Sequence, residues 1–131
     1  MSADAARGRW GFRLVSVDEL AAFRSSGSFC SALDTRDGFI HCSPASALVD
    51  TCRIYYGGRP DVMLLRVDLN ADILSTPPLR VQWDAVPSRA CDFPHVYGGP
   101  LPLRAVERVW GPLAIDGAGA HVLPSAAELS G

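Results

Sequence analysis

The sequence predicts an α+β fold, with several strands and two or three short helices. Two patterns carry this prediction: the nearly continuous apolar run of residues 62–67, typical of a central strand, and apolar residues at helical spacing within residues 45–56. The chain has 131 residues, of which 48% are hydrophobic, so one domain can bury a core without disulfides. We therefore expect a single domain.

The first elements are a strand and a helix. Residues 10–15 have the aromatic and branched content of a strand. Ser16 and Glu19 form a capping-box pattern, so a short amphipathic helix should follow and end at Gly27. Residues 28–38 are rich in serine and aspartate and are predicted to form a loop.

A second strand and helix should follow that loop. Residues 39–42 have the character of a short strand. Ser43 and Pro44 are typical of a helix start, because serine accepts hydrogen bonds from free amides and proline is tolerated at the first helical position. The helical spacing of residues 45–56 then ends at Gly57.

The second half of the chain is predicted to contain three more strands. Residues 62–67 should lie in the middle of the sheet, and residues 70–78 should form a turn or a single helical turn. Residues 79–84 alternate apolar and polar side chains, as in a half-exposed strand. Residues 87–102, with four prolines, are predicted to be a shaped loop, and residues 103–113 a last long strand.

These elements suggest three parts: a flexible N-terminus (1–9), one α+β domain (10–113) and a loosely packed C-terminal tail (114–131). The chain shows neither a membrane span nor a secretion signal, which favours a cytoplasmic protein. Its four cysteines lack short paired spacing, so we expect reduced thiols. A net charge of −2 argues against bulk binding of nucleic acid. The oligomeric state stays open.

His41 and Ser43 are the first candidate site residues. Strand alternation places both on the face that carries Phe39, with Cys42 on the other face. Hydroxyl, imidazole and the free amides of the next helix could then face one anionic or ribose-bearing ligand. The alternative is structural: His41 satisfied by a backbone carbonyl and Ser43 serving only as a helix cap.

His95, Tyr97 and Asp84 are the second group. His95 and Tyr97 alternate along an extended segment after Pro94, so an imidazole and a stacking ring share one side. Asp84, at the end of a predicted strand, could orient a sugar hydroxyl or stabilise a developing cation. The alternatives are a tyrosine that packs at a corner and a solvated carboxylate.

Neither a metal site nor a cysteine nucleophile is favoured. His41, Cys91 and His95 are dispersed ligands without a short cysteine pair, so we predict no metal. Cys91 near His95 is the best candidate for a nucleophile and base, although free cysteines are more often small buried apolar residues.

Three separated segments resemble the domain-of-unknown-function 952 family. They are GFIHCS at residues 38–43, LLRVD at residues 64–68 and FPHVYG at residues 93–98. The resemblance covers about residues 10–113, with the motifs in the expected order. It implies a compact, split, mostly antiparallel sheet similar to the ADP-ribosyltransferase fold, with a cleft that in relatives holds NAD or a related ADP-ribose compound.

The resemblance also implies roles for individual residues. His41 matches an early-strand histidine that binds ribose, and Tyr97 matches an aromatic residue that stacks on nicotinamide. Asp84 stands where the family often has glutamate, the residue that supports glycosidic cleavage.

The functional hypothesis is an enzyme acting on NAD, ADP-ribose or a phosphorylated nucleotide. His41 and Asp84 would be catalytic, and Ser43, His95 and Tyr97 would bind the ligand. NAD would be a substrate, with no cofactor assigned. The alternatives are a noncatalytic module that binds a nucleotide or small anion, and a purely structural role for both histidine motifs. The hypothesis requires the site residues to converge in one partly open pocket with apolar walls and an arginine at its rim.

Overall fold

The structure, a computed structural model, describes residues 8–131; most of the predicted flexible N-terminus lies outside this range. Within it, the strands are β1 (Trp10–Ser16), β2 (Ser28–Phe29), β3 (Ile40–His41), β4 (Val62–Asp68), β5 (Arg80–Val86), β6 (Cys91–Tyr97), β7 (Leu101–Pro102) and β8 (Val106–Trp110). The α-helices are α2 (Val17–Ser26), α3 (Ala32–Asp37), α4 (Leu48–Tyr56) and α5 (Ala126–Ser130). Short 3-10 turns are η1 (Ala45–Ala47), η2 (Asp72–Ser75), η3 (Pro87–Arg89) and η4 (Leu103–Ala105).

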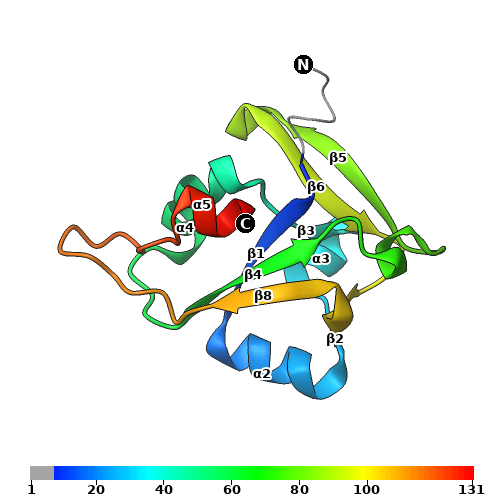
Figure 1. Cartoon of the computed structure of the whole chain (residues 1–131), viewed down its shortest axis with the longest axis horizontal. Helices are drawn as coiled ribbons and strands as arrows, with labels where there is room; N and C mark the ends of the chain where they lie inside the picture. Colours follow the sequence, from blue (N-terminus) through cyan, green and yellow to red (C-terminus); the bar gives the residue numbers. More distant parts are fainter. Residues whose placement is uncertain (1–7) are drawn as a thin grey trace.

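The strands form three antiparallel sheets, ordered β1-β4-β8, β2-β7 and β3-β6-β5 (Figure 1). An isolated bridge between Phe12 and Ser43 connects β1 with the chain just after β3. The α+β prediction with antiparallel strands is therefore confirmed. Four short α-helices are described where two or three were expected, and β4 is the central strand of its sheet, as its apolar run predicted.

Two cores lie on opposite faces of β4. Leu64 and the β1 residue Leu14 pack in one core, which the α4 residue Leu48 and the α5 residue Leu129 also enter. Leu65 belongs to the other core, which α2 and the inner face of β3-β6-β5 share. Strand alternation explains the division, because successive side chains of β4 point to opposite faces.

The first helix confirms its prediction, whereas the loop predicted for residues 28–38 is wrong. Ser16 and Glu19 make the expected capping box of α2. Residues 28–38 instead contain β2 and α3, and α3 begins with a second capping box, between Ser31 and Asp34. Asp34 stands at the position that glutamate usually takes in this motif. The start of α3 was therefore not recognised from the sequence pattern.

The prediction for residues 87–102 is also wrong, because residues 91–97 form β6, the central strand of its sheet. Pro94 lies opposite Trp83 of β5 but one residue beyond the part of β6 that pairs with β3. At Pro94, β6 therefore pairs with a strand on one side only, so the missing amide proton of proline is tolerated there. The long strand predicted for residues 103–113 is divided into η4 and β8.

The C-terminal segment, for which we expected loose packing, ends in α5, whose Leu129 is only 6% exposed. Arg66 of β4 is also buried, and its Nη1 donates to the carbonyl oxygens of Glu128 and Leu129, at 3.1 and 2.9 Å. Its Nε donates to Glu107 of β8 at 2.7 Å. Arg66 therefore ties α5 to the sheet by contacts that sequence periodicity does not show.

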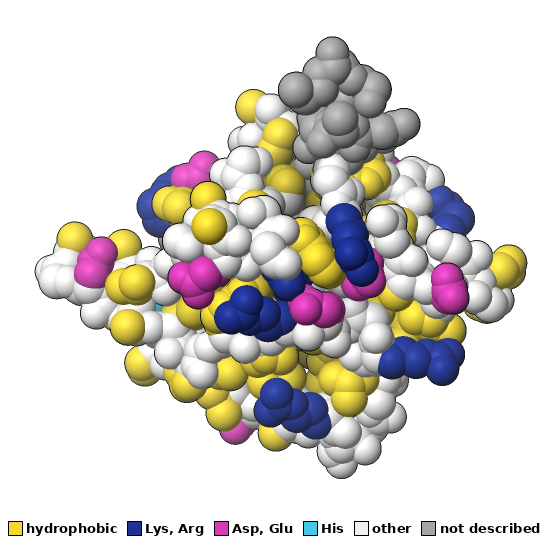
Figure 2. Space-filling view, viewed as in Figure 1, with side chains coloured by type: hydrophobic (Ala, Val, Ile, Leu, Met, Phe, Trp, Pro, Cys, Tyr) yellow, Lys and Arg dark blue, Asp and Glu magenta, His cyan; other side chains and the backbone are white. Residues whose placement is uncertain are grey.

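Basic and acidic side chains alternate over the face of β1, β4 and β8 that Figure 2 presents, without a patch of one sign. Arg9 pairs with Asp68 there at 2.9 Å, next to the pair of Arg66 and Glu107. This mixture agrees with the low net charge. No helix within residues 8–131 is long and apolar enough to span a membrane.

Replacing Arg66 with methionine is expected to lower the free energy of unfolding by about 1–3 kcal/mol, because two carbonyls of α5 lose their donor. The loss stays below that of a fully buried pair, since the Glu107 side chain is 41% exposed and can be hydrated. Urea unfolding would measure it. Arg108→Met, at an exposed arginine of β8 that has no ion pair within residues 8–131, is the matched control. Equal losses in both variants would contradict the role of Arg66.

Candidate functional site

His41 and His95 lie directly opposite each other in the short ladder between β3 and β6. Their neighbours in the ladder, Ile40 and Val96, point into the core, so the two histidines point to the opposite side of the sheet. Tyr97 follows His95 by two residues and shares its face. The register therefore places three predicted site residues, from segments more than fifty positions apart, on one side of one sheet.

Phe39 is the centre of this group. Its ring lies 4.2 Å from that of His95 in a stacked arrangement, 4.6 Å from His41 and 5.1 Å from Tyr97, measured between centroids. The two imidazoles are 5.6 Å apart, edge to face. Phe39, His41, Asp84, His95 and Tyr97 are called the histidine face below.

Two carboxylates hold the His41 ring. Its Nδ1 lies 2.7 Å from Oδ1 of Asp34, and its Nε2 lies 2.8 Å from Oδ2 of Asp37. A neutral imidazole carries one N–H and can donate to one of these oxygens, whereas an imidazolium can donate to both. His41 is 27% exposed, and Asp37, at the end of α3, is 29% exposed. A ligand therefore has to displace Asp37 to reach Nε2 of His41.

Asp34 is the buried anchor of this arrangement. Nη1 of Arg13 donates to its Oδ1 at 2.8 Å, and the same oxygen accepts from the His41 amide at 3.0 Å. Burial by itself would raise the pKa of Asp34, but hydrogen bonds from His41 and Arg13 outweigh it and hold the pKa well below its usual range. Asp34 is therefore ionised and balances the buried Arg13.

Asp84 positions His95 in a comparable way. Oδ2 of Asp84 lies 2.7 Å from Nδ1 of His95 and accepts a hydrogen bond from the Tyr97 hydroxyl. Oδ1 accepts from Nε2 of Gln82 at 2.6 Å. Burial acts to raise the pKa of Asp84, yet these three donors lower it below its usual value. Arg80 extends the network by donating to Gln82, and its guanidinium lies 4.4 Å above the Tyr97 ring.

His95 is neutral in this network at pH 7. Burial lowers its pKa below 6.5, and the neighbouring Asp84 only partly offsets that effect. Because ionised Asp84 accepts from Nδ1, the proton resides on Nδ1 and Nε2 keeps a lone pair. Within residues 8–131, Nε2 has no hydrogen-bond partner, and the one buried polar side-chain atom there without a partner is Nε1 of Trp110. Nε2 of His95 is thus a proton acceptor without a partner in the described protein, in a residue that is 4% exposed.

Ser43 does not join the histidine face. Its hydroxyl lies 3.2 Å from that of Thr51 in α4, and its backbone bridges to Phe12. The predicted cap is wrong, because Pro44 is the N-cap residue of η1 and no side chain caps that turn. The bridge to β1 turns Ser43 toward α4, so its hydroxyl is used there.

The cysteines do not form a nucleophilic pair with His95. Cys91 lies four residues before His95 on the same extended strand, which corresponds to about 13 Å. Burial raises the pKa of Cys42 to about 12, so that thiol is inert. No group of three His, Cys, Asp or Glu residues between positions 8 and 131 is placed to hold a metal ion.

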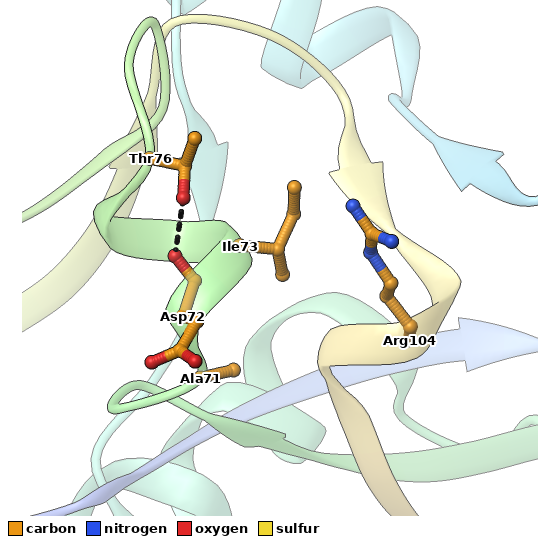
Figure 3. A pocket seen from close by; sticks show the side chains of 5 residues that line it. All are labelled: Ala71, Asp72, Ile73, Thr76 and Arg104. Carbon is orange, nitrogen blue, oxygen red and sulfur yellow. Dashed lines mark hydrogen bonds between the residues drawn. The ribbon is translucent and has the colours of Figure 1, made fainter.

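A surface depression of about 400 Å³ lies away from the histidine face (Figure 3). Ala71, Asp72 and Ile73 line one side, Thr76 lies beside them, and Arg104 stands across the opening. The Thr76 hydroxyl donates its proton to the backbone carbonyl of Asp72. Because no histidine or cysteine lines this depression, the chemistry favours the histidine face as the candidate site.

Several residues of the site were not predicted. Asp34 and Asp37 lie in the segment predicted to be a loop, and Arg13 lies on the first predicted strand, which carried no candidate site residue. The pattern from Ser31 to Asp34 is a capping box with aspartate, and it could have identified α3 and thereby the carboxylates beside His41. No sequence signal connects Arg13 with Asp34.

Comparisons with known proteins agree with one another. A family model described as "Protein of unknown function (DUF952)" matches residues 14–109. The crystal structure of protein CC0527 from Caulobacter crescentus is 30% identical, with a TM-score of 0.75, and the match covers 92% of this chain and 98% of that one. The solution NMR structure of CC0527 is 28% identical, with a TM-score of 0.69 and coverages of 85% and 90%. No curated protein matches.

Proposed function

The chain belongs to DUF952, a family of unknown function, and we propose that its histidine face binds a nucleotide-type ligand and acts on it. The candidate ligands are NAD, ADP-ribose and phosphorylated nucleotides. One observation carries the proposal: two histidines from distant segments converge on Phe39, each held by a carboxylate, and Nε2 of His95 is left without a partner. Apolar side chains would pack such a surface better, so the cluster is suited to a ligand.

The roles follow from the geometry. Phe39 and Tyr97 offer rings next to the histidines, which suits a planar base or nicotinamide. Nε2 of His41 would bind a ribose hydroxyl in place of Asp37. Arg80, whose guanidinium lies above the Tyr97 ring, supplies a cation at the rim of the site. Asp84 is occupied by His95, Tyr97 and Gln82 and would position His95 instead of facing the sugar.

With NAD, the proposed reaction is hydrolysis. The bond between ribose C1′ and the nicotinamide nitrogen breaks, and its electron pair leaves with nicotinamide. A water oxygen bonds to C1′ and gives a proton to Nε2 of His95, which acts as the general base. The finer proposal of an ADP-ribosyltransferase-like fold is supported by the split between the sheets β1-β4-β8 and β3-β6-β5. It rests on analogy of fold.

A noncatalytic binding module is the second candidate. Both ring nitrogens of His41 and both oxygens of Asp84 already have partners within the protein. No carboxylate of the histidine face is therefore free to contact a positively charged sugar. Ligand binding without product after long incubation would favour this function.

Imidazole NMR resonances would test the proposal sharply, because the chain has three histidines. NAD, ADP-ribose and AMP are titrated separately while the three rings are followed. We expect shifts at His41 and His95 and none at His121, whose Nε2 contacts the carbonyl of Arg59 at 2.6 Å. Equal shifts at all three rings, or none with any nucleotide, would contradict the proposed site. Release of nicotinamide from NAD then distinguishes the enzyme from the binding module.

A further inference from the structure

Arg89 lies beyond the Phe93 end of the histidine face. It ends η3, and its guanidinium is 5.0 Å from the centroid of the Phe93 ring. Phe93 precedes His95 by two residues on the same side of β6, so Arg89 extends the surface that carries His95. Arg80 stands at the opposite end, where it is paired in register with Tyr97.

The Arg89 side chain is held in place through one nitrogen. Its Nη2 donates to the Thr51 hydroxyl at 2.7 Å and to the Ala47 carbonyl at 3.1 Å. Thr51 donates its own proton to Ala47, so its hydroxyl oxygen accepts from Ser43 and from Arg89. Both partners of Nη2 are neutral, and they orient the guanidinium without neutralising its charge.

The charge of Arg89 has no counterion in the part of the chain described. Six other arginines there form ion pairs with carboxylates: Arg9, Arg13, Arg36, Arg53, Arg59 and Arg66. Arg89 is half-buried and belongs to none of these pairs. Its Nε and Nη1 make no hydrogen bond within residues 8–131, so both nitrogens keep N–H groups available to a ligand.

We propose that Arg89 is the anion subsite of the histidine face and binds a phosphate group of the ligand. Phe93 lies two residues of strand, about 7 Å, from His95, and the Arg89 guanidinium lies 5.0 Å from the Phe93 ring. A ligand that contacts both Arg89 and His95 would therefore extend over about 12 Å, comparable with a nucleoside diphosphate. The inference rests on the proposed function and names its substrate class: nucleotides with at least one phosphate, not nucleosides. The positive charge and the free N–H groups of Arg89 suit phosphate, because hydrogen bonds from a charged donor to phosphate oxygens are strong.

Isothermal titration calorimetry of ADP and adenosine would test the subsite. Arg89→Gln is expected to weaken ADP binding at least tenfold and to change adenosine binding less than twofold. Arg89→Lys, which keeps the charge but loses the planar guanidinium that Thr51 and Ala47 orient, should give an intermediate loss. Arg24→Gln, at an exposed arginine of α2, is the matched control and should bind both ligands like the wild type. Thermal unfolding of each variant verifies that the fold is kept.

Pyrophosphate alone separates this inference from the proposed function. In the wild type it should shift the Nε–Hε resonance of Arg89 while the His41 and His95 rings respond little. That result would support the anion subsite even if no nucleotide moved the histidine resonances. Full ADP affinity in Arg89→Gln, with His41 and His95 still responding to ADP, would overturn the subsite and leave the proposed function standing. No response to ADP or pyrophosphate would overturn both.

Discussion

Replacing Asp34 with alanine is expected to lower the free energy of unfolding by about 3–5 kcal/mol, because Arg13 then keeps a buried charge without a partner. Arg13 is 8% exposed and Asp34 is 1% exposed, so water cannot replace the lost carboxylate. The same change removes the capping box of α3 and the Nδ1 contact of His41. Urea unfolding at pH 7 measures the loss.

The matched control is Asp50→Ala, which removes an exposed carboxylate paired with Arg53 at 3.3 Å. It should change the free energy of unfolding by no more than about 0.5 kcal/mol. The folded-state pKa of Asp34 lies below its ordinary value of 3.8, so its contribution is complete above that value and is lost as pH falls further. The difference in the free energy of unfolding between the wild type and Asp34→Ala should therefore disappear in acid. A difference that stayed constant down to low pH would contradict this account.

The second large effect is expected on the proposed hydrolysis of NAD. His95→Gln is expected to reduce turnover of NAD at least about 100-fold, the usual contribution of a general base, while NAD binding changes little. Glutamine can still occupy the ring's place beside Asp84, but it cannot accept the proton through a basic nitrogen. His121→Gln is the control and should keep full turnover.

The pH dependence of turnover gives an independent test. Protonated His95 cannot act as a base, and burial holds its pKa below 6.5. Turnover should therefore rise with pH through a midpoint below 6.5 and reach a plateau above it. The residual activity of His95→Gln should not show this rise with pH. Unchanged turnover in His95→Gln would remove His95 from the mechanism, whatever the pH profile.

Local patterns predicted much of the fold. The capping box at Ser16 and Glu19 gave the start of α2, and the apolar run of residues 62–67 gave the central position of β4. These features depend on residues within one or two turns or on the side-chain period of one strand. The placement of His41 on the face opposite Ile40 follows from the same period.

The sequence by itself therefore determined the α+β class, the helix α2, the strands β1, β4 and β5, and the placement of His41 on the face opposite Ile40. The tertiary structure alone decided the partners: Asp34 and Arg13 beside His41, Asp84 on His95, and Thr51 on Ser43. Such partners come from antiparallel register and from the packing of separate elements. A one-residue change of register would turn every side chain of a strand to the other face while leaving the composition of the strand unchanged. The chemistry of the histidine face thus follows from pairing across distant segments, which no local pattern in the chain encodes.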